Sequence, residues 1–508
     1  MMAPPSRPPH RAGANRMKRP PNSAPLAAAH EGGIRRRAAV GAIACSLIAG
    51  CMIGPDYRRP EVAAPGAYLY EPKQTAATAN VEFWKQFDDP VLDALIAEAL
   101  ANNKNVKIAA ANVEQAAGVL TSTRSPLFPQ LNYQGSAARE RFSQGGLDKL
   151  PAGISNPTNA YQLLAGASWE IDLWGRVRRL TESAQASLLA SDEARRGVIL
   201  SLVASVASGY LQLRGLDEQL VMAQRTLASY AESLRLMELK FRYGRVSQMN
   251  VEQAKARYQT AAAQLPRIRR DIALTEDALS VLLGNSPGRI PRGKGIFALT
   301  LPPVPPGVPS ELLERRPDLL QAEQQLIAAN ALIGAAKAQY FPTISLTGAL
   351  GTASTDLSNL FTGPARAWSY AGALAGPIFT GGAIAGQVAQ AEAAQQAALL
   401  SYELAIQSAF ADVDNALISR ETLIDQVAAQ AQLVDALRGY SRLAQLLFDG
   451  GRAPYSTVLQ AEEQLFPAEL DWAAAQAQLC VSLVNIYKAM GGGWVTAADK
   501  LTAKPPSN

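Results

Sequence analysis

Two periods of apolar residues alternate along this chain, one typical of strands and the other typical of helices. Between residues 160 and 173, apolar side chains stand at every second position, with mostly polar or small residues between them. Residues 130–141, 343–353 and 367–379 alternate in the same way. Alternation over runs of this length predicts strands that each present one apolar face. The chain therefore carries four predicted strands, in two well-separated pairs.

Most of the remaining chain has the composition and spacing of long helices. Residues 175–240 contain no proline and are rich in Ala, Leu, Gln and Glu, which favour helix. A further helix is predicted to begin at Asp88-Asp89-Pro90, where Asp can cap free amides and Pro suits the first turn, and to continue to about Ser125. About 60 helical residues at about 1.5 Å each form a rod of roughly 90 Å. In the second half, apolar and small residues follow the three-and-four steps of a coiled coil: Ile424, Val427, Ala431, Val434, Leu437, Ser441, Ala444 and Phe448.

The second half of the chain repeats the pattern of the first. The sequence Phe241-x-x-Gly244-Arg245 recurs as Phe448-x-x-Gly451-Arg452, a shift of 207 residues. A period this long is not that of a solenoid and indicates a duplicated half. Each half is predicted to hold helices, two strands and a helical hairpin, with its tip near Gly244 or Gly451. The predicted divisions are a first repeat at 88–285, a Pro/Gly-rich linker at 286–310, a second repeat at 311–494 and a tail at 495–508.

The start of the chain has the layout of a lipoprotein signal. Arg35-Arg36-Arg37 precedes an apolar run at 38–47, and Cys51 directly follows an Ala-Gly pair. A basic region, a short apolar region and small residues indicate a secretory signal, and the run is too short to span a bilayer as a helix. We therefore expect residues 1–50 to be removed and Cys51 to carry an N-acyl and an S-diacylglyceryl group, followed by a lipid-anchored extended segment at 51–87. The open alternative is an ordinary signal beside a chance cysteine.

Removing residues 1–50 changes what the composition implies. That segment holds eight of the 48 basic residues and one of the 43 acidic ones, so 40 basic and 42 acidic residues remain, a net charge of −2. This balance gives no reason to expect nucleic-acid binding. Both histidines, His10 and His30, fall in the segment, and Cys51 and Cys480 are the cysteines that remain. We expect no disulfide, no metal site and no other cofactor in the mature chain.

Four strands of this length cannot close a membrane barrel by themselves. A strand needs about 9–11 residues to cross an outer membrane, and open strand edges in lipid leave amides unpaired at several kcal/mol each. Two chains would give eight strands with a filled interior, whereas three would give twelve, enough for an aqueous lumen. The predicted fold class is a mixed α/β membrane protein, a trimeric twelve-stranded transmembrane β-barrel continued by a long α-helical coiled-coil barrel. A soluble β-sandwich would also alternate, but long helices separate these strands.

Five motifs occur in order between residues 51 and 494. They are Cys51-Met52-Ile53-Gly54-Pro55-Asp56-Tyr57-Arg58-Arg59-Pro60, Trp84-x-x-Phe87-x-Asp89-Pro90-x-Leu92, Ile171-Asp172-Leu173-Trp174-Gly175-Arg176, Glu314-Arg315-Arg316-Pro317-Asp318-Leu319 and Tyr487-Lys488-Ala489-Met490-Gly491-Gly492-Gly493-Trp494. The set resembles the TolC-like outer-membrane factors, above all their NodT-type lipoprotein branch. This resemblance implies a homotrimer that is lipid-anchored in the cell outer membrane and has a periplasmic helical extension. It also implies a passive exit duct, not an enzyme, that joins a periplasmic adaptor (membrane fusion) protein and an inner-membrane efflux transporter to expel drugs or other small toxic molecules.

The resemblance also implies roles for two sets of residues. The turns Gly244-Arg245-Val246-Ser247 and Gly451-Arg452-Ala453-Pro454 match the family's adaptor-docking hairpin tips, although the glycines could simply end helices. The family often narrows its tunnel with an acidic residue after the second tip glycine. That position is Gln460 here, with Thr457 and Glu463 nearby. Three copies of Gln460 would form a neutral constriction; a solvated helix face is the other interpretation.

Two other functions fit parts of the pattern. A periplasmic coiled-coil lipoprotein scaffold without a pore would explain the helices and the anchor, but not the four one-faced strands. An envelope hydrolase would need a catalytic set of residues, and the mature chain has no histidine and no recognisable nucleophile motif. The sequence therefore favours the outer-membrane duct.

Overall fold

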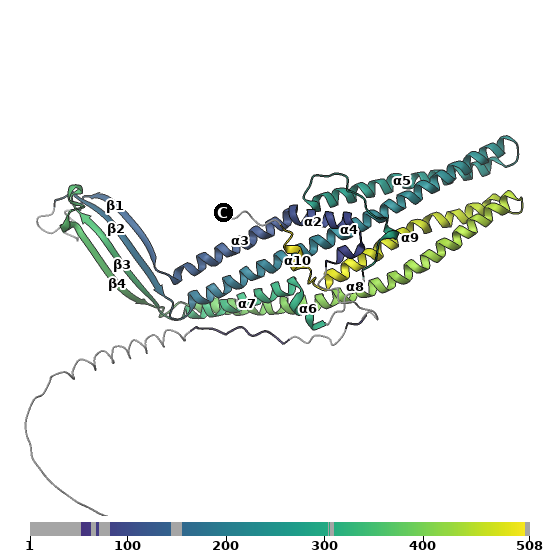
Figure 1. Ribbon diagram of the computed structural model, residues 1–508. Helices are drawn as coiled ribbons and strands as arrows, with labels where there is room; N and C mark the ends of the chain where they lie inside the picture. The colour runs from purple at the N-terminus through teal and green to yellow at the C-terminus, as the bar shows by residue number, and fades with distance from the viewer. Residues whose placement is uncertain are drawn as a thin grey trace, which may run out of the picture. The chain divides into compact units, whose positions relative to one another are not determined.

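The computed structural model describes residues 52–61, 68–70, 82–143, 155–302, 304 and 309–502, all within one unit, Met52–Asn508. The predicted signal and Cys51, the predicted site of lipidation, lie outside the described residues. Within this unit, four strands lie at one end and the turns of two long helical hairpins lie at the other (Figure 1).

The four strands form a single antiparallel sheet. They are β1 (Gln130–Glu140), β2 (Thr158–Ile171), β3 (Thr343–Ser354) and β4 (Arg366–Ala375), in the order β1-β2-β3-β4. Each strand pairs with its neighbour in sequence, so the two repeats meet where β2 pairs with β3. β1 and β4 are the edges of the sheet, and each has one side unpaired among the described strands. The sheet is therefore open at both edges.

Exposed aromatic side chains line both edge strands. Tyr133 on β1 is 88% exposed, and Trp368 and Tyr370 on β4 are 71% and 81% exposed. Soluble monomers rarely expose large apolar areas, so exposed rings of this kind are typical of a surface that contacts lipid or another chain. β4 ends at Ala375, whereas the alternation predicted a strand to 379, because Pro377 has no N–H to continue the ladder.

Two long hairpins make up most of the remaining structure. α4 (Arg176–Arg242) and α8 (Ala383–Asp449) have 67 residues each, or about 100 Å of helix at about 1.5 Å a residue. α5 (Gln248–Leu283) returns along α4, and α9 (Tyr455–Ala489) returns along α8. The other helices are α2 (Pro90–Asn102), α3 (Lys104–Arg124), α6 (Pro309–Arg315), α7 (Pro317–Ala338) and α10 (Val495–Asp499), with 3-10 turns at Phe83–Phe87, Ser125–Leu127, Ile296–Ala298, Leu357–Asn359 and Gly363–Ala365.

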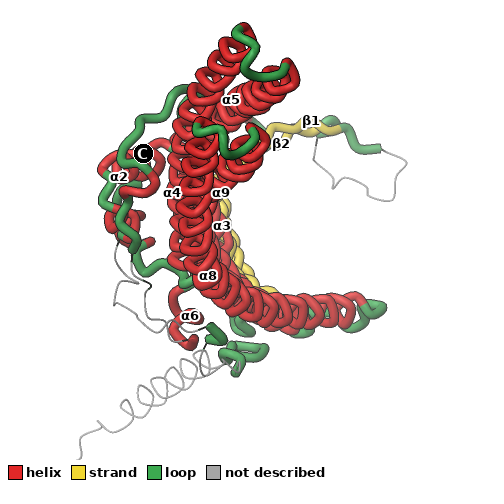
Figure 2. Tube along the Cα trace, turned by 90° about the vertical axis from the view of Figure 1, so that its right-hand side faces the viewer, coloured by secondary structure: helices red, strands yellow, loops and turns green. Residues whose placement is uncertain are grey.

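The helices form one curved layer. Toward the hairpin tips α4 packs on α5 and α9, and toward the sheet it packs on α3 and α7. α8 packs on α9 and on α7. The order across the layer is therefore α5-α4-α9-α8 near the tips and α3-α4-α7-α8 near the sheet. Figure 2 shows the layer as an arc that is open on one side, with α5 toward one end and α8 toward the other. Near the sheet, α3 packs on α4 on the side away from α7 and α8.

The predicted helix over 88–125 is in fact two helices, because it is interrupted at Asn103. This side chain is 3% exposed. Its Oδ1 accepts the amides of Asn105 and Val106 at 2.8 and 3.2 Å, which caps α3. Its Nδ2 donates to the carbonyl of Leu282 at 2.7 Å, which fixes the break against the end of α5.

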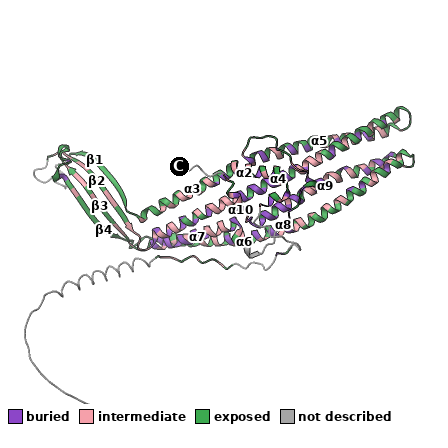
Figure 3. Ribbon diagram, in the orientation of Figure 1, coloured by how far each residue is buried: buried purple, intermediate pink, exposed green. Residues whose placement is uncertain are grey.

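Buried side chains are concentrated in the middle of the unit (Figure 3). The rings of Phe83 and Tyr487 are stacked with centroids 4.8 Å apart, and those of Trp84 and Trp494 meet edge to face at 5.3 Å. All four side chains are almost fully buried. Clusters of large aromatic rings stabilise a core through area and through ring geometry. This cluster joins the segment before α2 to the end of the second repeat.

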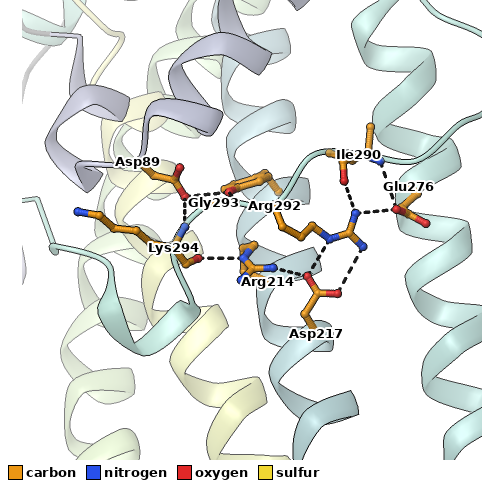
Figure 4. Close-up of polar contacts among 9 residues, drawn as sticks. Asp89, Arg214, Asp217, Glu276, Ile290, Arg292, Gly293 and Lys294 are labelled. Carbon is orange, nitrogen blue, oxygen red and sulfur yellow. Dashed lines mark hydrogen bonds and ion pairs between the residues drawn. The ribbon is translucent and has the colours of Figure 1, made fainter.

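The segment between the repeats is held against the first hairpin by charged side chains (Figure 4). Arg292 donates to Asp217 of α4 at 2.9 Å and to Glu276 of α5 at 2.6 Å. The amide of Lys294 donates to the fully buried carboxylate of Asp89 at 3.1 Å. Asp89 also caps α2, as the sequence predicted. The segment thus fastens α2, α4 and α5 to one another.

The junction between strands and helices is built from two residues of the Ile171–Arg176 motif. The indole nitrogen of Trp174 donates to the carbonyl of Pro342 at 2.7 Å, and its ring stacks on Phe341 at 4.7 Å. Asp172 accepts two of the first amides of α4 at 3.0 and 2.9 Å. These contacts set the direction in which α4, the first arm of the first hairpin, leaves the sheet.

Candidate functional site: the hairpin tips

Both hairpins end in the same turn. Gly244 and Gly451 have φ of 67° and 69°, the left-handed conformation that glycine adopts most easily. The amide of Arg245 donates to Lys240 O, and that of Arg452 donates to Leu447 O, both at 2.8 Å. Together with the bonds from the glycine amides, this is the Schellman arrangement that ends a helix. The prediction of two left-handed tip turns is confirmed, and docking at these turns stays a prediction.

The side chains of the tip turns are largely open to solvent. Gly244, Arg245, Ser247, Gly451, Arg452 and Pro454 are exposed, and Val246 and Ala453 are partly buried. Two further apolar side chains beside the first turn, which sequence reasoning missed, are Tyr243 at 75% and Met249 at 66% exposed. Each copy therefore presents two arginines, one per turn, next to exposed apolar area. Such a surface can bind a partner hairpin through apolar contact and charge together.

A small apolar core joins the two hairpins just above the turns. We call it the tip core; its buried residues are Met237, Ala254, Ala444, Tyr455, Val458 and Ala461. Val246 and Phe448 pack against its edge. Ala254 and Ala461 occupy equivalent places in the two repeats, 207 residues apart. The tip core fixes the two turns of one copy relative to each other, so that together they form one surface.

A buried ion pair links the same two hairpins. Arg257 Nη1 of α5 lies 2.5 Å from Glu462 Oε2 of α9, and each side chain is 15% exposed. The guanidinium lies 4.4 Å from the ring centroid of Tyr230 on α4, whose hydroxyl donates to the carbonyl of Glu462 at 3.2 Å. Burial raises the pKa of Glu462, and the charge of Arg257 opposes that shift without cancelling it. We call this contact the interhairpin ion pair.

A second, more exposed contact joins the hairpins closer to the turns. Lys240 Nζ of α4 lies 3.5 Å from Asp449 Oδ1 of α8 and 4.5 Å from the ring centroid of Phe448. Both charged side chains are more than a third exposed, so solvent screens this pair. Of the two links, the interhairpin ion pair is the stronger constraint.

The three candidate constriction residues lie along one face of α9. Gln460 and Glu463 are exposed and Thr457 is partly buried, while Val458 and Ala461 face the tip core. Among the described residues, the side chains of Thr457, Gln460 and Glu463 form no hydrogen bond or ion pair. This face is thus free in a single copy, and its role as a constriction stays a prediction.

The comparison with protein-family models decides the family. The model of the outer membrane efflux protein family matches residues 95–285 and 308–492. The chain belongs to the outer membrane efflux protein family. An outer membrane efflux protein is a transport channel located in the outer membrane, so the predictions of family, location and transport role are confirmed.

This outer membrane efflux protein has named relatives over nearly its whole length. It is 37% identical over 456 residues to the solvent efflux pump outer membrane protein SrpC of Pseudomonas putida, covering 88% of this chain and 96% of the relative. It is 33% identical over 453 residues to the cation efflux system protein CusC of Escherichia coli, covering 88% and 96%.

Solved channel structures share the fold. The CmeC outer membrane channel of Campylobacter jejuni superposes with a TM-score of 0.83 at 25% identity, covering 89% of this chain and 99% of that one. The open state of the MtrE outer membrane channel of Neisseria gonorrhoeae gives 0.79 at 32% identity, covering 87% and 99%. The open-edged sheet and the long hairpins are therefore features of a channel fold.

Proposed function

We propose that this protein is the exit duct of a tripartite efflux system and that it works as a homotrimer. The observation that carries the proposal is a four-stranded sheet, open at both edges, that continues into hairpins about 100 Å long. Three copies would close a twelve-stranded barrel with room for an aqueous lumen, whereas two would give an eight-stranded barrel filled by side chains. The curved helical layers of the three copies would continue this lumen as a periplasmic tube.

The strands are the proposed membrane-spanning part. They have 11, 14, 12 and 10 residues, and a transmembrane strand needs about 9–11. The exposed aromatic rings on β1 and β4 suit the membrane interface, where such rings gather. The described helix α4 contains an 18-residue window apolar enough for a membrane span, but 56% of that window is buried inside the protein. That window is therefore part of the protein core.

The chain's own N-terminal segment supports a lipid anchor on Cys51. The amide of Ile53 donates to the carbonyl of Trp174 at 3.1 Å. Arg179, only 1% exposed, donates to the carbonyls of Ile53 and Gly54 at 3.2 Å each. The residues that follow the cysteine are thus fixed at the junction of strands and helices. In the proposed trimer this junction lies at the periplasmic surface of the outer membrane, where the N-acyl and S-diacylglyceryl groups would enter lipid.

The proposed partners bind at the hairpin tips. Gly244, Arg245, Val246 and Ser247 and their counterparts Gly451, Arg452, Ala453 and Pro454 would contact a periplasmic adaptor protein. The tip core supports this assignment, because it fixes the two turns of each copy as one surface. The adaptor would couple the duct to an inner-membrane efflux transporter.

The proposed cargo is drugs or other small toxic molecules. Relatives of this chain are named for the efflux of solvents, antibiotics and cations. A wide aqueous lumen conducts without tight binding, so selection among cargoes would lie with the transporter. Near the tips, Gln460 with Thr457 and Glu463 would form the narrowest ring of this lumen, with no fixed charge at position 460.

The test is the conductance of the purified oligomer in planar bilayers, with its mass measured in the same detergent preparation. Discrete conducting steps from a trimer are the expected result. A monomer, or a trimer that does not conduct even after substitutions that loosen the tips, would overturn the duct. The result would then favour a lipoprotein scaffold without a pore.

A further inference from the structure

A pocket of about 400 Å³ lies where two helices of the layer meet end to end. α9 ends at Ala489 and α7 begins at Pro317, and both helices pack on α4 and on α8. The layer is therefore interrupted where these two helix ends face each other, and the volume of the interruption is in the range that small molecules occupy. We call it the junction pocket; the side chains that matter for its chemistry are Ser201, Arg316, Asp412, Asn415, Asn485 and Lys488.

The junction pocket opens on the concave side of the arc. Figure 2 shows α2 and the loops beside it on the convex side. The N-terminal segment contacts α8 through the amide of Leu69, which donates to Asp414 at 3.0 Å, and the inter-repeat segment contacts α9 at the ring of Trp472. Each helical residue turns by about 100°, so Asp412 lies about 160° around α8 from Asp414, and Lys488 about 160° around α9 from Trp472. In the proposed trimer the concave side faces the lumen.

Arg316 is the buried centre of this pocket and is 8% exposed. Its guanidinium donates to both carboxylate oxygens of Asp318 at 3.0 and 2.8 Å and to Asp412 Oδ2 at 2.9 Å. It also donates to the carbonyls of Ala409 and Ala489 at 3.4 and 3.1 Å. These five bonds match the five N–H groups of a guanidinium, so Arg316 has no donor left for a ligand. Because two carboxylates share this one cation, the group has one negative charge in excess.

The first repeat shows that the fold does not need these charges at a junction of this kind. Arg316 precedes α7 and donates to the carbonyl of Ala489 at the end of α9. At the equivalent place, 213 residues earlier, Asn103 precedes α3 and donates to the carbonyl of Leu282 near the end of α5. A neutral amide therefore makes the same connection. The charged residues of the second junction have uncharged equivalents in the first: Asn105 for Asp318, Ser205 for Asp412 and Val281 for Lys488.

Two charged groups of the junction pocket have bonding capacity to spare. Lys488 is exposed, and its ammonium forms no hydrogen bond or ion pair with another described residue. The Asp412 side chain is 55% exposed, and only its Oδ2 accepts from Arg316, which leaves Oδ1 free among the described residues. A ligand with a single charge would be attracted by one of these groups and repelled by the other. A ligand with both charges would match both groups.

We propose that the junction pocket binds a small zwitterion, with its ammonium on Asp412 and its carboxylate on Lys488. Exposed Ser201, Asn415 and Asn485 supply uncharged donors and acceptors around it. Because both charged groups are open to water, binding is weak, on the order of millimolar. The site itself lies within one copy; its place in the lumen wall rests on the proposed function. It would hold cargo of this class briefly without blocking the duct.

Binding is measured on the full-length protein by saturation-transfer NMR titration at low salt. The probes are glycine, 4-aminobutanoate and 6-aminohexanoate, which separate the two charges by increasing lengths. Each is compared with the carboxylic acid and the amine of the same number of carbons. We expect at least one amino acid to bind at least tenfold more tightly than its two single-charge counterparts, and less tightly at high salt, which screens exposed charges.

Two substitutions test the assigned groups. Lys488→Met removes a charge that has no partner in the fold, and Asp412→Asn keeps an oxygen that can still accept from Arg316. Each should weaken binding of the best amino acid at least tenfold. The matched controls are Lys255→Met, on the exposed side of α5, and Asp471→Asn, exposed on α9, and both should leave the affinity unchanged.

The outcomes separate this proposal from the proposed function. A conducting trimer that binds none of the three amino acids, or binds them no better than the single-charge compounds, would overturn the site and leave the duct intact. Binding that survives both Lys488→Met and Asp412→Asn would also overturn it. A protein that binds an amino acid through both groups but does not conduct would overturn the duct and leave the site in place.

Discussion

Replacing Arg257 with Met removes the cationic half of the interhairpin ion pair. Removing one partner from a buried pair costs about 3–5 kcal/mol, because the other charge stays buried and unpaired. Both side chains are only 15% exposed, so water screens this pair little. The lower end of this energy range applies to Arg257→Met, because Glu462 can take up a proton and so avoid being left as an unpaired charge. We therefore expect a loss of about 3 kcal/mol in the local stability of the tips, or roughly a 100-fold increase in local opening.

The assay is hydrogen exchange, read by mass spectrometry on peptides from α5 and α9 around positions 257 and 462. Exchange in these peptides should speed up by that factor, while peptides from the aromatic cluster near Trp494 stay protected. Arg438→Met is the matched control. Arg438 pairs with Glu469 within one hairpin and is 45% exposed, so its loss should cost at most about 1 kcal/mol.

Two further results would refute the reasoning. If Arg257→Met changed exchange no more than Arg438→Met does, the ion pair would not hold the hairpins together. The double variant Arg257→Met/Glu462→Met should recover most of the lost protection, because an apolar pair of similar volume replaces a buried ion pair at little cost. Exchange as fast as in the single variant would contradict that account.

The pH dependence of the same variant has a definite sign. Burial raises the pKa of Glu462 above its ordinary value, so the folded tip holds this proton more readily than the unfolded chain does. The stability contributed by this group is therefore present at low pH and lost as pH rises through the raised pKa. The loss of tip stability caused by Arg257→Met should become smaller on acidification, since a protonated Glu462 has no charge left to be compensated by Arg257. A penalty that grows at low pH would contradict the assignment.

Three other predictions concern single positions. Gly244→Ala or Gly451→Ala should destabilise the tips by about 1–2 kcal/mol in hydrogen exchange, because a Cβ is strained in the left-handed conformation. Gly118→Ala, in the exposed interior of α3, should be neutral or stabilising. Equal effects at the three sites would contradict this. Cys480 is fully buried, and burial raises the pKa of its thiol to about 12, so iodoacetamide at pH 8 should label it only after unfolding. Rapid labelling of the native protein would disprove its burial. Gln460→Asp should reduce single-channel conductance or raise cation selectivity in planar bilayers, and unchanged values would remove position 460 from the constriction.

The strands could be predicted from the sequence because a period of two is read directly from neighbouring residues. The tip turns could be predicted as well, since a glycine between two long helical patterns has few other uses. The end of β4 was missed because Ile378 continues the apolar alternation, while the backbone of Pro377 cannot continue the ladder. The break at Asn103 was missed because one Asn within a helical pattern carries no signal that its amide will reach Leu282, far away in sequence.

The interhairpin ion pair shows where sequence reasoning stops. Arg257 and Glu462 belong to different repeats, and each has the appearance of an ordinary charged residue in a helix. Whether they meet depends on how α5 and α9 are placed around α4, which no local pattern fixes. The acidic residues near Gln460 could be noticed in the sequence, but Glu462 and Glu463 face different sides of α9, and only the structure separates the buried one from the exposed one.

The equal lengths of α4 and α8 constrain how this fold can change in evolution. Deleting seven residues from one hairpin arm would raise one tip by about 10 Å relative to its neighbour and pull the tip core out of register. The returning helix of that hairpin would have to shorten with it, and so would both helices of the other hairpin. A viable change in tube length therefore takes four matched deletions along one gene. Insertions and deletions should be rare in these helices and far more frequent in the loops that join them.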